Sequence, residues 1–316
     1  MQLKDEAIVV KERGVIVLWL RCICASVVII LVVGGITRLT GSGLSMVEWR
    51  PVMGVLPPST DADWEGVFAQ YREFPEYKLL NKGMSLAEFK GIFFWEYLHR
   101  ILGRFVGLLC LLPYLWFLWK KRLDGSLKGR GLGLVLLVGA QGLMGWYMVK
   151  SGLARDPEVS HYRLAAHLGL AFAVFGLAWW TLLDLSSAKE RAEVPRWARF
   201  WALGLLGLLC LQVTYGAFTS GLKAGFGFNT FPKMESDWMP DALFSLTPYW
   251  KNFVEDRFSV QFIHRWLGTI VVLATIAYGW IVLRSIELSA WQRDILHCVL
   301  GLAVTQFCLG GLRRGG

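Results

Sequence analysis

The segment Glu96-Tyr97-Leu98-His99-Arg100 opens an apolar run that continues to Trp119, and it determines how the rest of the chain is interpreted. Residues three apart share one face of a helix, so Glu96 and His99 are expected side by side. An ionisable pair at the mouth of a membrane helix is costly to keep and marks a functional site by default. This segment is therefore our first candidate site.

The same pattern returns later in the chain. Ile263-His264-Arg265-Trp266-Leu267-Gly268 matches Leu98-His99-Arg100-Ile101-Leu102-Gly103. Three apolar runs also end in Gln, three residues and Gly, at positions 141–145, 212–216 and 306–310. Together these repeats indicate an internal duplication.

The composition is that of a membrane protein. The 316 residues are 55% hydrophobic with a mean hydropathy of +0.45, and the apolar residues come in long blocks. Each block is long enough to cross a hydrocarbon core of about 30 Å. We therefore predict an all-α polytopic membrane protein with seven spanning helices, at about 14–38, 91–119, 131–149, 163–183, 198–220, 258–283 and 291–311.

The charge pattern predicts how these helices are oriented. The net charge of +9 does not indicate a nucleic-acid partner, because the basic residues lie in short segments at alternate helix ends. By the positive-inside rule, the N-terminus is cytoplasmic and the long loops at 39–90 and 221–257 are outside. The start of the chain resembles neither a cleavable signal nor a transit peptide, which favours a bacterial inner membrane.

The duplication predicts two tandem, pseudo-symmetric bundles. Residues 1–185 supply four helices and residues 186–316 supply three. By symmetry an eighth helix should follow Gly311, so we expect the chain to be truncated there.

The first outer loop carries two further local signals. Ser85-Leu86-Ala87-Glu88 has the pattern of a capping box and should start the helix that continues into the second span. Earlier in the loop, apolar residues suggest a lid against the membrane: Met46, Val47, Val52, Met53, Val55 and Leu56.

Three histidines stand near outer helix ends: His99, His167 and His264. Haem iron takes neutral imidazole as an axial ligand, and two helices of a bundle can supply one each. Gly103 and Gly268 follow their histidines by one turn, which leaves a smooth groove for a flat macrocycle. We interpret the three histidines as haem ligands.

The other two histidines do not fit this pattern. His161 is expected about 120° around the helix from His167, as a residue at the loop end or beside the ligand. His297 lies near the inner end of its helix and is interpreted as an interfacial residue.

Four charged side chains lie near the histidines, each with two interpretations. Glu96 either relays protons or stabilises positive charge at the haem edge, or it is an exposed helix-start carboxylate. Arg38, Arg100 and Arg265 either pair with anionic groups such as haem propionates or extend to the membrane interface.

Taken together, the sequence resembles the haem A synthase family over nearly its whole length. The resemblance lies in GGITRLTGSGLS at 34–45, EYLHR at 96–100, QGLMGWYMVKSGL at 141–153, YRLAAHL at 162–168 and FIHR at 262–265. All six cysteines fall within predicted helices, as in the alphaproteobacterial and mitochondrial type that lacks loop cysteines.

The resemblance implies two four-helix bundles and oxidation of the C8 methyl group of haem O to a formyl group, giving haem A for cytochrome c oxidase. It implies that His99 and His167 hold haem O, that Glu96 is the catalytic carboxylate, and that His264 binds haem b with a ligand from the eighth helix. Implied partners are haem O and haem A, membrane lipid, haem O synthase and the oxidase assembly machinery. The electron donor is not identified, and homo-oligomerisation stays open.

Two rival functions use parts of the same pattern. A non-catalytic haem-b membrane cytochrome would need the histidines but not Glu96. A transporter would suit duplicated bundles but would not need histidines at matched depth.

Overall fold

The computed structural model describes residues 2–47, 56–152, 159–186 and 193–311, and for 2–12 the backbone only. Within these ranges the structure is helical and contains no β-strand. Seven of the described helices are long and apolar enough to cross a membrane. The predicted all-α polytopic membrane protein is therefore confirmed. The chain forms two compact units, residues 1–186 and 187–316.

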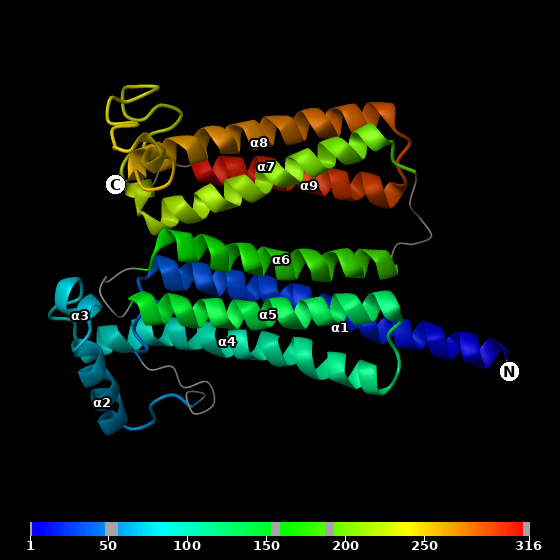
Figure 1. The fold of residues 1–316 in the computed structure, drawn as a ribbon, viewed down its shortest axis with the longest axis horizontal. Helices are drawn as coiled ribbons and strands as arrows, with labels where there is room; N and C mark the ends of the chain where they lie inside the picture. The colour runs from blue at the N-terminus through cyan, green and yellow to red at the C-terminus, as the bar shows by residue number, and fades with distance from the viewer. Residues whose placement is uncertain (1, 48–55, 153–158, 187–192, 312–316) are drawn as a thin grey trace. The chain divides into compact units, whose positions relative to one another are not determined.

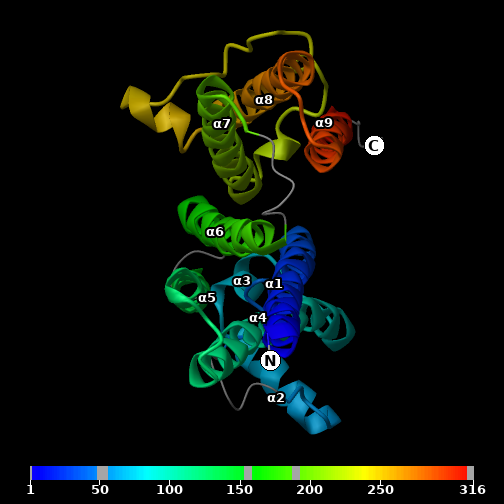
Figure 2. The same cartoon turned by 90° about the vertical axis from the view of Figure 1, so that its right-hand side faces the viewer.

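Unit 1 is a four-helix bundle, seen along its length in Figure 1 and from one end in Figure 2. Helix α1 packs against α4 and α6, and α5 packs against α4 and α6, so the four helices close into a ring. Their bounds are α1 (Gln2–Leu39), α4 (Leu86–Trp119), α5 (Gly125–Gly152) and α6 (His161–Ser186).

The bundle core is apolar on every helix. Its fully buried side chains include Leu20 and Ile23 of α1, Cys110 and Phe117 of α4, and Leu134 of α5. Trp19 adds a polar tie, because its indole N–H donates to the carbonyl of Leu109 at 2.7 Å. These contacts fix α1 against α4, the helix that carries Glu96 and His99.

The start of α4 follows from its sequence. The Ser85 hydroxyl accepts from the Glu88 amide, and the Glu88 side chain accepts from the Ser85 amide. This is the predicted capping box, and it satisfies two of the otherwise unpaired groups of the first turn. Helix α4 then runs without a break to Trp119.

Two short helices, α2 (Asp61–Arg72) and α3 (Pro75–Leu79), lie between α1 and α4, and the sequence analysis did not predict them. They cover the N-terminal part of α4 through an aromatic cluster of Phe68, Tyr71, Phe89 and Phe93. Of the residues expected in a lid, Met46 and Val47 pack on this cluster and Leu56 is exposed. Val52, Met53 and Val55 lie outside the described residues.

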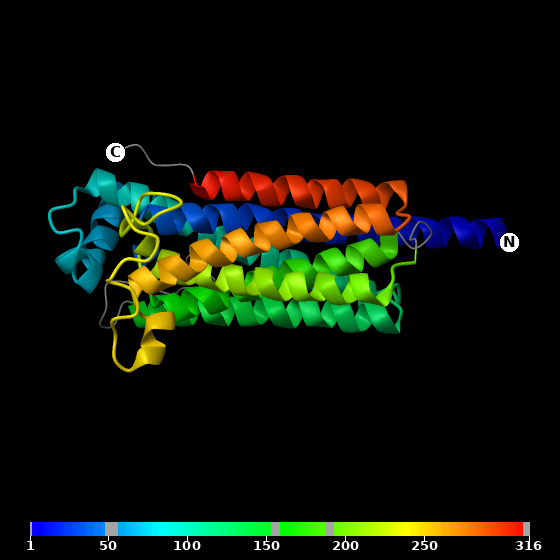
Figure 3. The ribbon, with the colours of Figure 1, turned by 90° about the horizontal axis from the view of Figure 1, so that it is seen from above.

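Unit 2 contains α7 (Arg196–Gly221), α8 (Arg257–Ser285) and α9 (Ala290–Gly311), with α8 in contact with both others (Figure 3). Two short 3-10 helices, η2 (Ala224–Phe226) and η3 (Tyr249–Phe253), lie in the loop between α7 and α8. The Tyr278 hydroxyl donates to the carbonyl of Ala198 at 3.2 Å and ties α8 to α7.

Basic side chains stack on tryptophans at the predicted inner ends of the helices. In unit 1, Lys120 lies 4.1 Å from the Trp119 ring centre, and Arg130 lies 5.0 Å from that of Trp180. In unit 2, Arg284 lies 4.0 Å from the ring centre of Trp280. Tryptophan and basic residues together are typical of a membrane–water interface. The pairs therefore mark where the helices leave the hydrocarbon.

We predict that Gly131→Ala destabilises unit 1 by about 1–3 kcal/mol, because a Cβ there would lie 2.6 Å from two atoms of the Tyr114 ring. That ring cannot easily move aside, since its hydroxyl donates to the carbonyl of Lys128 at 3.1 Å. The matched control is Gly139→Ala, whose Cβ would meet nothing within 4 Å. Thermal unfolding in detergent should show a lower Tm for Gly131→Ala only, and equal Tm values would contradict the packing described.

Candidate functional site

Two histidines of unit 1 face each other across the bundle. The ring centres of His99 on α4 and His167 on α6 lie 6.5 Å apart, with ring planes at 68°. An imidazole–metal bond is about 2 Å long, and a ring nitrogen lies about 1 Å from its ring centre. Two imidazoles on opposite sides of one metal therefore have ring centres about 6 Å apart. The separation of the two ring centres is close to that spacing.

Glycines make room for these rings on the neighbouring helices. A Cβ on Gly34 of α1 would lie 3.1 Å from the His99 ring, and one on Gly145 of α5 would lie 3.4 Å from the His167 ring. Of these two glycines, Gly145 belongs to the repeated Gln–Gly pattern at 141–145. A larger residue would push an imidazole out of its place.

Gln141 adds a polar contact to this pair. Its side-chain nitrogen lies 3.3 Å from Nε2 of His167. Nδ1 of His167 and Oε1 of Gln141 are buried and make no hydrogen bond in the structure. Buried polar groups without partners are rare in folded proteins and call for an explanation. A bound haem would ligate one imidazole nitrogen of His167 and leave the other free to change its hydrogen bonding. The unpaired His167 and Gln141 atoms are consistent with such a ligand.

Glu96 is buried, with 3% of its surface exposed, so it is not an exposed helix-start carboxylate. Its Oε2 accepts from the Ser45 hydroxyl at 2.6 Å and from the Met46 amide at 2.8 Å. Its Oε1 accepts from Nε and Nη2 of Arg100 at 3.0 and 2.5 Å. Glu96 precedes His99 by three residues on α4, so the two share one face of that helix. A buried Glu96–Arg100 ion pair therefore lies one turn before His99.

The arginines that follow the two repeated histidines hold the outer loops. Arg100 donates to the Met46 carbonyl at 2.8 Å as well as to Glu96. In unit 2, Arg265 donates to the carbonyls of Phe228 and Thr230. These contacts join each arginine to a loop beside its histidine. Arg38, the third candidate, lies partly buried in the last turn of α1.

In unit 2, as in unit 1, a glycine of the neighbouring helix lies beside a candidate ligand histidine. A Cβ on Gly216 of α7 would lie 3.2 Å from the His264 ring of α8. One turn further in, a Cβ on Gly268 would lie 2.8 Å from the Gln212 side chain. The helix pair α7–α8 thus copies α1–α4, where Gly34 faces His99. Nδ1 of His264 is buried and makes no hydrogen bond, so this ring also fits a haem ligand.

The remaining histidines have different surroundings. His161 lies in the first turn of α6 and its ring packs on Tyr162, with ring centres 4.0 Å apart. His297 is exposed on α9.

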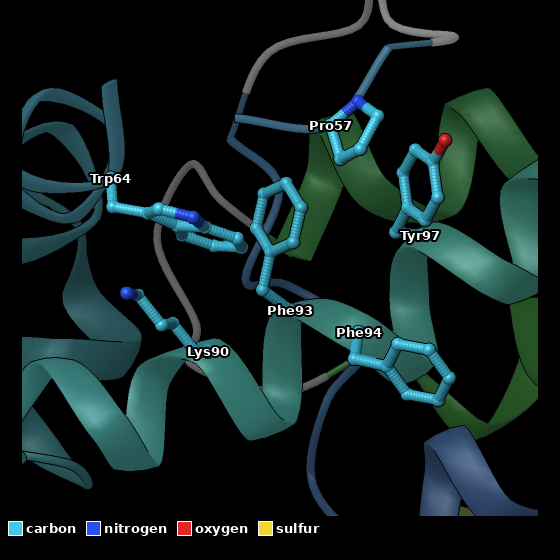
Figure 4. Close-up of a pocket in the computed structure, with 6 residues that line it drawn as sticks. All are labelled: Pro57, Trp64, Lys90, Phe93, Phe94 and Tyr97. Atoms are coloured by element: carbon cyan, nitrogen blue, oxygen red, sulfur yellow. The ribbon is translucent and has the colours of Figure 1, made fainter. Parts of the chain in front are cut away.

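A pocket of about 320 Å³ lies beside α4, as Figure 4 shows. Its α4 residues are Lys90, Phe93, Phe94 and Tyr97, at spacings of three and four, so they share one face of the helix. His99 follows Tyr97 by two residues, which is about 200° of turn. The pocket therefore opens on the opposite side of α4 and is not part of the histidine site.

The sequence analysis missed Ser45, Met46 and Gln141 as members of the site. Gln141 had been noticed only as part of a repeated pattern. The one signal for Ser45 was the small-residue run Thr40-Gly41-Ser42-Gly43-Leu44-Ser45, which allows a tight turn after α1. Nothing in that run indicates that it reaches Glu96, more than 50 residues later.

We predict that Gly34→Ala weakens haem binding by about tenfold, because the added methyl group displaces the His99 ring. Gly35→Ala is the control, since its Cβ would meet nothing within 4 Å. Haem titration of each purified variant, followed by absorbance, measures the difference. Equal affinities in the two variants would show that His99 does not need this space.

Comparison with known proteins supports one family. The family model COX15-CtaA, described as a cytochrome oxidase assembly protein, matches residues 17–312. The Heme A synthase of Nitrosomonas eutropha is 43% identical over 300 residues, which cover 93% of this chain and 84% of that protein. The Heme A synthase of Parvibaculum lavamentivorans is 47% identical over 262 residues, 83% of this chain and 76% of that protein.

A third relative, the Heme A synthase of Nitrosospira multiformis, is 44% identical over 299 residues, 93% of this chain and 83% of that protein. No solved structure matches the chain. The family model and these relatives cover both units, including the segments that carry His99, His167 and His264. The chain belongs to the COX15-CtaA family.

Proposed function

We propose that this chain is a haem A synthase, an oxidoreductase that converts the C8 methyl group of haem O to the formyl group of haem A. The observation that carries the proposal is the His99–His167 pair, whose ring centres lie 6.5 Å apart in a bundle of a family whose relatives are named Heme A synthase. The product is the haem that cytochrome c oxidase requires.

Unit 1 holds the substrate. His99 and His167 would ligate the iron of haem O. Glu96, held by Ser45 and Arg100, would either relay a proton or stabilise positive charge that develops at the haem edge.

Unit 2 binds haem b through His264, whose ring is accommodated by Gly216. A haem b held there supplies one-electron transfer. Its role would be to carry electrons between the substrate and an unidentified donor or acceptor. Arg38 lies in the last turn of α1, whereas Arg100 and Arg265 lie within α4 and α8 and contact Glu96 and loop carbonyls. All three are candidates to pair with haem propionates.

The membrane setting follows from the same residues. The excess of basic residues in the short loops supports a cytoplasmic N-terminus by the positive-inside rule, and the stacked tryptophans at those helix ends are consistent with a membrane interface there. We place the chain in a bacterial inner membrane, beside haem O synthase and the oxidase assembly machinery. The description of the matched family supports this setting.

Pigment extraction separates this function from its rivals. The protein is purified from cells that make haem O, and its haems are resolved by chromatography. Haem O or haem A supports the enzyme, haem b alone supports an electron-transfer cytochrome, and a protein without haem supports a transporter. The cytochrome is the nearer rival, because the facing histidines would serve it equally well.

We predict that His99→Ala and His167→Ala each lower haem O retention by about tenfold or more, because each removes one of two facing imidazoles. His297→Ala is the control, since that histidine is exposed on α9. Haem O per protein and haem A formed are measured for all three variants. Unchanged retention and turnover in both ligand variants would refute the pairing.

We predict that Glu96→Ala still binds haem O but forms haem A at least about a hundredfold more slowly, because the histidines remain while the fixed charge is lost. The visible spectrum of the bound haem reports binding, and chromatography of the product reports turnover. A normal rate of haem A formation in this variant would show that the assigned role is wrong.

A further inference from the structure

The turn after α1 contains two serines with no exposed surface, Ser42 and Ser45. The Ser42 hydroxyl pairs with that of Thr40 at 2.6 Å, so its contact stays within the turn. The Ser45 hydroxyl reaches out of the turn to Glu96 of α4. The two serines are therefore alike in burial but differ in what they touch.

Ser45 has one hydroxyl hydrogen and three oxygens within reach. Glu96 Oε2 lies at 2.6 Å, the Ser42 carbonyl at 3.1 Å and the Ile92 carbonyl at 3.5 Å. The carboxylate is the nearest and the only charged acceptor of the three. Hydrogen bonds to charged acceptors are shorter and stronger than those between neutral groups. The Ser45 hydroxyl therefore donates its hydrogen bond to Glu96.

Residues of the turn and of α4 bind this carboxylate together. Arg100 of α4 binds Oε1, while Ser45 and the Met46 amide bind Oε2. Arg100 also donates to the Met46 carbonyl at 2.8 Å, which closes a ring of contacts between helix and turn. Without the turn, Oε2 would lose both donors and the side chain would be restrained through one oxygen only.

We propose that Ser45 is a positioning residue for Glu96: it holds the carboxylate in the orientation that the reaction at the histidine pair requires. This role rests on the proposed function, because it assigns Glu96 to haem A formation. The Ser45 hydroxyl contacts Glu96 and two backbone carbonyls rather than the histidines. Its effect passes through the orientation of one carboxylate.

The test compares Ser45→Ala with Ser42→Ala in the 316-residue chain supplied with haem O. Loss of one hydrogen bond to a buried charge should lower kcat for haem A formation by roughly tenfold. KM for haem O and the visible spectrum of the bound haem should stay unchanged, because both imidazoles remain in place. Ser42→Ala, equally buried but without contact to Glu96, should keep kcat within about twofold of the parent chain.

A second measurement does not depend on activity. Thermal unfolding without haem is followed for Ser45→Ala, Glu96→Ala and the double variant. Since the two side chains share a bond, Ser45→Ala should lower Tm in the parent chain and have little further effect in Glu96→Ala. Ser42→Ala should lower Tm by the same amount in both backgrounds.

Three results would overturn the proposal. One is an equal loss of kcat in Ser42→Ala and Ser45→Ala, which would point to the fold of the turn. Another is a change in KM or in the haem spectrum that accounts for the lower rate. The third is strict additivity of Ser45→Ala and Glu96→Ala in Tm. If the parent chain forms no haem A, the proposed function fails, while the unfolding measurements still decide whether Ser45 holds Glu96.

Discussion

The facing imidazoles of His99 and His167 impose the central constraint on unit 1. A polar ring among membrane helices costs free energy unless its nitrogens have partners. Gln141 supplies a contact for one nitrogen of His167, and the other is buried without a hydrogen bond. A haem iron ligated by both rings would give one nitrogen of each ring a partner and would match their separation. The helices, the glycines and the outer turn can all be understood as support for that separation.

The support uses one device repeatedly. A glycine on the neighbouring helix faces each ligand ring, in the pairs Gly34 with His99, Gly145 with His167 and Gly216 with His264. The three pairs lie at three different helix–helix contacts, α1–α4, α5–α6 and α7–α8. The arrangement therefore does not come from the packing of one helix pair. An arginine directly after His99 and after His264 then binds loop carbonyls. The duplication seen in the sequence is thus a duplication of ligand environment.

Helix positions and the ends of the spans could be predicted because they follow from local properties: hydropathy sets the spans, and the Ser85–Glu88 capping box sets the start of α4. The histidines could be singled out because polar residues in apolar runs are conspicuous. The contact of Ser45 with Glu96 could not, because it depends on the path of a turn between distant segments. Helices α2 and α3 were not predicted for a related reason, because their apolar residues are buried only by packing against α4.

The most direct test of this account is the ligand set of haem O in the 316-residue chain. Electron paramagnetic resonance of the ferric protein is recorded in a His264→Ala background, so that a haem in unit 2 does not obscure the signal. The account predicts a low-spin iron with two imidazole nitrogens, which becomes high-spin when His167→Ala is added. A high-spin iron with a single nitrogen ligand before that substitution would contradict the facing-histidine site.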